Sequence, residues 1–371
     1  MKTFHCDHCQ ALLFFESTQC LKCGHVLAFL PDLQRVAALE STQGNEWQRV
    51  GDGKVGRRYR LCANYEGAQV CNGALGVEEA QTLCRSCRLT TVIPSLDVAG
   101  HREAWGKLEN AKRRMLYTLY ALGCVVRDRA EDSQTGLGYQ FLAQVPGGPK
   151  ILTGHDQGVI TVNIAEADDA TREAQRNKLH EPYRTLLGHF RHEIGHYYWM
   201  LLIEGRPRQE AFRTTFGDER VDYSGALKTH YDRGAPAGWE AHYISAYAAS
   251  HPWEDWAESW AHYLHMFDVL ETAADSGLKL EPSRADEPTL TEARVDTVVS
   301  FDELVGRWFP VTFVLNNLNR SMGLPDGYPF VLSDEVINKL RFIHDTIQEH
   351  RQGSCRCAGS RAGSGLQRPS S

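Results

Sequence analysis

The sequence predicts an α+β protein in which a small cysteine-rich β region precedes a mostly helical domain that contains a small sheet. Eight of the eleven cysteines lie within the first 87 residues. From residue 99 onward, long segments repeat apolar residues at three- and four-residue steps, which is the period of an α-helix. Two short segments rich in β-branched residues interrupt these helices and are typical of strands.

The predicted β region covers residues 1–95, and its cysteines form two sets of four. In the first set, ten residues separate two Cys-x2-Cys pairs, which is the spacing of a zinc ribbon. The second set combines one Cys-x2-Cys pair with two cysteines that have eight residues between them. The chain starts without an apolar signal segment, so we expect reduced thiols in the cytoplasm rather than a disulfide framework. We therefore predict two structural Zn²⁺ ions, one held by Cys6, Cys9, Cys20 and Cys23 and the other by Cys62, Cys71, Cys84 and Cys87.

The overall composition is ordinary for a soluble globular protein. Hydrophobic residues make up 42% of the chain and charged residues 23%, with a net charge of −7. No apolar run approaches the roughly 18 residues of a membrane span, so we expect a cytoplasmic protein without a membrane segment. A locally basic stretch around Arg57 and Arg58 is more typical of a solvated face than of a nucleic-acid groove.

The helical domain is predicted to span residues 99–350. Its first helix runs from Ala99 to about Leu122 and ends at Gly123. Two strands follow, at Tyr139–Val145 and Gly158–Ile164. The remaining predicted elements are a helical segment at residues 166–180, helices at Tyr183–Ile203 and from Pro252, a charged loop at 275–296, helices at Phe301–Asn319 and Asp334–Gln348, and a disordered tail at 352–371.

The helix predicted from Tyr183 to Ile203 contains the sequence His-Glu-Ile-Gly-His. Residues four apart share one face of a helix, so His192 and His196 can bind one metal ion. Glu193 lies beside this pair, where it can act as general base toward a zinc-activated water. Gly195 is a poor helix former, and its missing side chain can allow backbone or substrate to approach the metal.

A third metal ligand is predicted in the helix that begins at Pro252. Catalytic zinc usually has three protein ligands and one open position. In this helix two carboxylates and two imidazoles recur at steps of four, four and three residues, and therefore share one face. Such charge is costly to bury among tryptophans unless it is paired or metal-bound. The four residues are Glu254, Glu258, His262 and His265.

The segment Glu254-Asp-Trp-Ala-Glu-Ser-Trp-Ala261 resembles the ExxA(E/D/N)x(aromatic)A helix of gluzincin-type metallopeptidases. With its cysteine-rich start, the chain resembles, over most of residues 1–350, a bacterial family of putative zinc-binding metallopeptidases with an N-terminal zinc ribbon. The resemblance implies a zincin-like fold for the helical domain, with Glu254 as the third zinc ligand. It implies that Glu258 orients a ligand imidazole.

Several residues near these motifs have other predicted roles. Glu258 and Asp255 are the alternatives to Glu254 as the third ligand. His262 and His265 are expected to be outer partners or packed helix residues, and His189 to be structural or to contact substrate. Candidates for stabilising an oxyanion are Tyr223, Tyr231, Tyr243, Tyr247 and His242.

In zincins an edge strand above the cleft pairs with an extended peptide substrate. The segment Val159–Ile164 is the best candidate for this strand, because it lies shortly before the HExxH helix. An internal position in the sheet is the alternative for the same segment.

Together these features predict a zinc metallopeptidase with one catalytic and two structural Zn²⁺ ions. Its partners would be a peptide or protein substrate and, through the zinc ribbons, a protein or a nucleic acid. Two alternatives stay open: a regulatory or scaffold protein with a non-catalytic HExxH domain, and an amidase acting on a non-peptide amide. Glu193 favours a hydrolase, because a purely structural metal site needs no general base.

Overall fold

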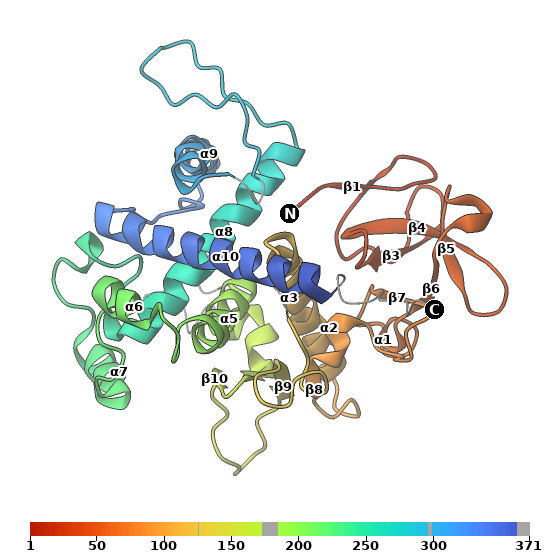
Figure 1. Cartoon of the computed structure of the whole chain (residues 1–371), viewed down its shortest axis with the longest axis horizontal. Helices are drawn as coiled ribbons and strands as arrows, with labels where there is room; N and C mark the ends of the chain where they lie inside the picture. Colours follow the sequence, from red (N-terminus) through yellow and green to blue (C-terminus); the bar gives the residue numbers. More distant parts are fainter. Residues whose placement is uncertain (125, 173–184, 296–298, 362–371) are drawn as a thin grey trace, which may run out of the picture.

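The computed structural model describes residues 1–124, 126–172, 185–295 and 299–361. It confirms the predicted α+β class. A β-rich N-terminal region lies to one side of a helical domain that contains its own small sheet (Figure 1).

The N-terminal region is built from short antiparallel strands. Strands β1 (Phe4–His5) and β2 (Leu12–Leu13) form a two-stranded ribbon. A five-stranded sheet follows, in which each strand pairs antiparallel with the next along the chain. Its strands are β3 (Val26–Leu30), β4 (Arg35–Ser41), β5 (Trp47–Arg49), β6 (Arg58–Leu61) and β7 (Ala74–Gly76), accompanied by the short helices α1 (Ala63–Glu66) and α2 (Arg85–Arg88).

The second sheet has four strands in the order β10-β11-β9-β8. Strands β8 (Thr90–Val92), β9 (Gly138–Leu142) and β11 (Val159–Asn163) are parallel, and β10 (Gly154–Asp156) is antiparallel to β11. The prediction that Val159–Ile164 forms the edge strand is therefore wrong. The alternative prediction, an internal strand, is correct, because β11 lies between β10 and β9. A tight turn through Gln157 and Gly158, both with positive φ, folds β10 back onto β11 and makes β10 the edge.

Long helices form the rest of the domain. They are α3 (His101–Ala121), α5 (Leu186–Leu202), α6 (Gln209–Phe216), α7 (Tyr223–Arg233), α8 (Pro252–Asp275), α9 (Phe301–Ser321) and α10 (Asp334–Arg361). Their starts follow local chemistry: the Thr185 side chain accepts the Gly188 N–H at the start of α5, and His251 caps α8 just before Pro252. Helix α5 packs along α8, and a single apolar core joins both to α3, α9, α10 and the sheet.

Within the predicted helical segment at 166–180, the described residues form the end of a 3₁₀ turn, Ile164–Ala167, and a helical turn at 169–172. Residues 173–184 lie outside the described part of the chain. The loop predicted at 275–296 joins α8 to α9 and projects from the body (Figure 1). Helix α10 continues to Arg361, past the predicted start of a disordered tail at residue 352, while residues 362–371 are not described. Among the described residues, no helix has both the length and the apolar character needed to cross a membrane.

Candidate metal centre

His192 and His196 lie one turn apart on the face of α5 that packs against α8, where Glu254 occupies the first turn. The Nε2 atoms of the two histidines are 3.1 Å apart. Glu254 Oε2 lies 2.9 Å from His192 Nε2 and 3.5 Å from His196 Nε2. A tetrahedral zinc ion with N and O ligands at their usual distances has ligand–ligand edges of about 3.3 Å. The three atoms therefore form a ready-made triangular face for such an ion.

Burial and charge also fit a cation at this position. All three side chains are buried, and their donor atoms lie within 4.8 Å of one another. Burial would lower the pKa of His192, but Glu254 and Glu258 raise it well above its usual value. Burial would raise the pKa of Glu254, but His196 and His192 hold it well below its usual range. An ionised carboxylate aimed at two imidazoles in a dry site is stabilised by a divalent cation.

Outer partners orient these side chains. Glu258 Oε1 accepts a hydrogen bond from His192 Nδ1 over 2.7 Å, which leaves the Nε2 lone pair directed at the site. Glu258 Oε2 in turn accepts one from Ser245 Oγ at 2.6 Å. The Tyr223 hydroxyl donates to Glu254 Oε1 at 2.6 Å, and Trp253 packs its ring 4.3 Å from that of His196. Each of the three donor side chains is therefore held by a group outside the site.

Glu193 lies beside the triad with one oxygen held and one open. Its Oε1 is 3.1 Å from His189 Nε2, whereas its Oε2 is buried and has no hydrogen-bond partner among the described residues. His189 Nδ1 lies 2.5 Å from Glu166 Oε2. Burial alone would lower the pKa of His189, but Glu166 and Glu193 raise it to about 9. The buried Glu193 has a lowered pKa, because His189, His192 and His196 outweigh its desolvation. This carboxylate is therefore ionised at neutral pH.

The structure directs the other candidate ligands elsewhere. Asp255 points toward α10, where its Oδ2 lies 2.7 Å from the Lys339 ammonium. His262 Nδ1 lies 2.9 Å from the Tyr328 hydroxyl. His265 Nδ1 lies 2.8 Å from the guanidinium of Arg191. Of the four polar residues on this face of α8, only Glu254 and Glu258 reach the histidine pair.

Of the five residues considered for stabilising an oxyanion, two lie beside the triad. Tyr223 is bound to Glu254, and the Tyr247 ring is 5.8 Å from that of His192. Tyr243 covers the Lys339 ammonium and His242 binds Glu335, both at α10. Tyr231 is more than half exposed on α7.

The two cysteine sets also converge as the spacing predicts. The Sγ atoms of Cys6 and Cys23 are 3.6 Å apart, as are those of Cys9 and Cys20. In the second set the Sγ atoms of Cys71 and Cys84 are 3.7 Å apart. Four thiolates around one zinc ion have edges of about 3.8 Å, far longer than a disulfide bond. All four cysteines of the second set are buried, whereas Cys9 and Cys23 of the first are half-buried.

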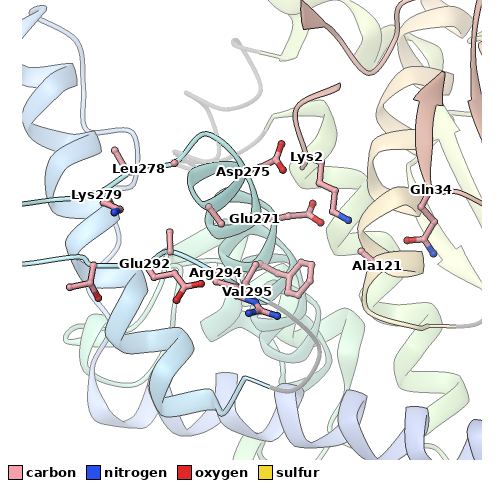
Figure 2. A pocket seen from close by; sticks show the side chains of 15 residues that line it. Lys2, Gln34, Ala121, Glu271, Asp275, Leu278, Lys279, Glu292, Arg294 and Val295 are labelled. Atoms are coloured by element: carbon pink, nitrogen blue, oxygen red, sulfur yellow. The ribbon is translucent and has the colours of Figure 1, made fainter. Parts of the chain in front are cut away.

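A cavity of about 550 Å³ lies away from these centres. The C-terminal half of α8, the loop that follows it, and Lys2 and Gln34 of the N-terminal region enclose it (Figure 2). Its lining contains none of the metal triad, and two of its three acidic residues are already engaged: Glu271 accepts from the Tyr117 hydroxyl and Asp275 from Thr3. The candidate metal centre therefore does not lie in this cavity, and its converging donor atoms, rather than a cavity, identify it.

Three features of the site were not predicted. Glu166 reaches His189 across 23 residues of sequence, and Ser245 reaches Glu258 from the segment before α8. Strand β10 was unrecognised because it has only three residues, yet His155 within it packs against Tyr197 and Trp253 beside the triad. No local pattern marks any of these positions.

The chain is similar to known proteins over most of its length. Residues 101–346 match the model of a family described as "putative zinc-binding metallo-peptidase", and residues 3–98 match that of a zinc-ribbon domain. Uncharacterized proteins of Mycobacterium bovis and Mycobacterium tuberculosis are 42% identical over 351 residues, which cover 94% of this chain and 96% of theirs. No solved structure matches the chain with statistical significance. The chain therefore belongs to the putative zinc-binding metallo-peptidase family and carries an N-terminal zinc ribbon.

Proposed function

We propose that the protein is a zinc-dependent peptidase in which His192, His196 and Glu254 hold the metal and Glu193 is the general base. The observation that carries this proposal is the placement of Glu193. Glu193 directly follows His192 in the sequence, and its buried Oε2 has no hydrogen-bond partner among the described residues. The neighbouring triad consists of two imidazoles and a carboxylate whose donor atoms converge. A closed structural site has four protein ligands and no use for such a base.

Zinc, when bound, would polarise the scissile carbonyl and make water a stronger acid. The protein's own groups supply the remaining steps. Glu193 would take a proton from the attacking water and deliver it to the leaving amine. Tyr247, whose ring lies 5.8 Å from that of His192, would donate a hydrogen bond to the oxygen that gains charge.

A peptide substrate suits the outer edge of the small sheet. Strand β10 ends the sheet and contacts α5, the helix that carries His192 and His196. An extended peptide can add to such an edge through main-chain hydrogen bonds, whichever side chains it carries. A non-peptide amide gains nothing from this edge, and this difference favours a peptidase over an amidase.

The decisive experiment compares wild type with Glu193→Gln on denatured protein, short peptides and simple amides in parallel. We expect the wild type to cleave peptides and Glu193→Gln to lose about 10²–10⁴-fold in kcat while keeping its metal. Full activity of Glu193→Gln would overturn the mechanism. Turnover of simple amides alone would favour an amidase.

Metal content per chain tests the ligand set. We expect about three zinc ions in the wild type and about two in Glu254→Ala, from two cysteine sites and one triad. Three ions in both proteins would show that Glu254 is not a zinc ligand. Two ions in both would show that the triad holds no zinc, and a regulatory function would then be favoured.

A further inference from the structure

A continuous chain of polar side chains connects the edge of the small sheet to Glu193. It begins at Thr153, directly before β10, whose hydroxyl donates to Glu166 Oε1. Glu166 Oε2 contacts His189 Nδ1, and His189 Nε2 contacts Glu193 Oε1, at 2.5 and 3.1 Å. The Glu166, His189 and Glu193 side chains are only 7%, 13% and 6% exposed. This chain is therefore largely shielded from water.

The chemistry of these side chains determines which atoms donate the hydrogen bonds. Each nitrogen of His189 faces a carboxylate oxygen, and an ionised carboxylate only accepts hydrogen bonds. Both nitrogens therefore donate, and the ring lies as a cation between two buried anions. Hydrogen bonds between ionised partners are about twice as strong as neutral ones, so the geometry of Glu193 is tightly held.

We propose that His189, itself held by Glu166, is a positioning residue for Glu193. This inference rests on the proposed function, because it specifies which oxygen of Glu193 accepts the proton. The Nε2–H of His189 occupies Oε1, which leaves Oε2 as the single oxygen that can accept a proton. Without this hydrogen bond the carboxylate can rotate about its side-chain bonds, and a displacement of about 1 Å at a reacting group costs about 10²-fold in rate.

A purely structural role for His189 makes a different prediction. Its cationic ring would then only neutralise Glu166 and Glu193, and any neutral replacement would have the same effect. Two amide side chains separate the roles, because they imitate different ring nitrogens. The glutamine amide nitrogen reaches the position of Nε2 and can donate to Glu193, whereas the asparagine nitrogen reaches that of Nδ1 and can donate only to Glu166.

The experiment compares His189→Gln with His189→Asn in the full-length, zinc-loaded protein. We expect His189→Asn to lose about 10²-fold in kcat, and His189→Gln to retain at least about ten times more activity than His189→Asn. Metal content, KM and the thermal midpoint should be alike in both. Equal losses in the two variants, or none, would overturn the proposal.

A matched control is His344→Asn. His344 is also buried, and its Nδ1 lies 2.9 Å from the Tyr263 hydroxyl on α8, away from the triad. This variant should lower the thermal midpoint without changing kcat. Such a result shows that loss of a buried histidine is not by itself enough to lower turnover.

A readout independent of turnover is the proton NMR signal of the ring N–H groups of His189. Two slowly exchanging low-field signals should be present in the wild type and absent from His189→Gln, and Glu193→Ala should accelerate exchange of one. If the wild type cleaves no substrate but Glu193→Ala has this effect, the proposed function fails while the positioning contact stands. If Glu193→Ala leaves both signals unchanged, the positioning inference is wrong whatever the activity.

Discussion

Glu258 makes two contacts that would together orient His192, a proposed metal ligand. Its Oε1 binds His192 Nδ1 and its Oε2 binds the Ser245 hydroxyl. The first contact selects the tautomer of His192 whose Nε2 is free to bind metal, and the second prevents the carboxylate from turning away. Ser245 would therefore influence a bound metal through two intervening side chains, those of Glu258 and His192.

We expect Glu258→Ala to weaken zinc binding at the triad by about 10–100-fold, because His192 loses the acceptor that orients it. Ser245→Ala should have a smaller effect in the same direction. Competition with a chelator of known affinity measures both. The exposed Glu281 is a suitable control, and equal zinc affinity in Glu258→Ala and Glu281→Ala would contradict the predicted role.

At the scale of elements, Gly195 allows α5 and α8 to approach closely. A Cβ at this position would lie 3.0 Å from Ala257 Cα and 3.1 Å from Trp260 Cβ. The Gly195 carbonyl also accepts the Trp256 indole N–H at 2.8 Å. The missing side chain of Gly195 makes room for α8. The sequence alone instead predicts that this space lets backbone or substrate approach the metal.

Gly195→Ala should therefore destabilise the protein. Alanine gains about 1 kcal/mol in helix propensity, but overpacking at this contact costs about 1–3 kcal/mol and moves the helix that carries Glu254. Gly306→Ala in α9 is the matched control, because nothing lies within 4 Å of its added Cβ. Chemical denaturation should show opposite signs for the two variants. Stabilisation by Gly195→Ala would show that the helices adjust freely.

Helix α10 holds α8 through a buried ion pair. The Lys339 ammonium contacts Asp255 Oδ2 at 2.7 Å and donates to the His242 carbonyl at 2.6 Å, with both charged side chains at most 3% exposed. The pair fixes the turn of α8 that carries Glu254. This contact explains why a carboxylate next to the metal triad takes no part in it.

Lys339→Met should lower the free energy of unfolding by about 3–5 kcal/mol, because it leaves the Asp255 charge buried without a partner. Adding Asp255→Leu should recover most of this loss, since an apolar pair of similar volume removes the uncompensated charge. Urea denaturation of both variants measures the difference. A double variant no more stable than Lys339→Met would contradict this account.

At the scale of the whole molecule, the second cysteine cluster lies where the N-terminal region meets α3. The Arg113 guanidinium of α3 donates to the Val70 carbonyl at 2.7 Å, one residue before Cys71. On the same helix, Arg114 binds Glu16 and Tyr117 packs against Phe15. The first cluster also lies near α3, since Cys6 and Cys20 share a small apolar core with Tyr117, but two of its cysteines are partly exposed.

The two cysteine sites should therefore differ in their effect on the helical domain. Cys84→Ser and Cys9→Ser should each lose one zinc ion, but Cys84→Ser should also lower the thermal midpoint of the helical circular dichroism signal. Such small sites depend on metal for their folding. Both lie near α3, but all four cysteines of the second are buried and α2, which carries Cys87, contacts α3, whereas two cysteines of the first are half-buried. Equal melting of the two variants would show that the helical domain folds independently of both sites.

Much of this architecture follows from short-range patterns in the sequence. Helical periodicity predicts α3, α5, α8, α9 and α10, and the strands β9 and β11 follow from their β-branched residues. The histidines at 192 and 196 share one face of a helix whatever lies around them. The cysteine pairs likewise bring their thiols together through local turns. The sequence alone therefore determined the fold class, and it singled out the residues that we propose as metal donors and general base.

Tertiary structure decided which of several equivalent residues meets which. Glu254, Asp255 and Glu258 lie within about one helical turn, but α5 and α10 approach α8 from different sides. Glu254 and Glu258 meet the two ring nitrogens of His192 on α5, whereas Asp255 meets Lys339 on α10. The edge position of β10 depends on a turn of two residues, and the contact of Glu166 with His189 depends on the return of a distant segment. These outcomes are set by packing between elements far apart in the chain, which local residue patterns do not encode.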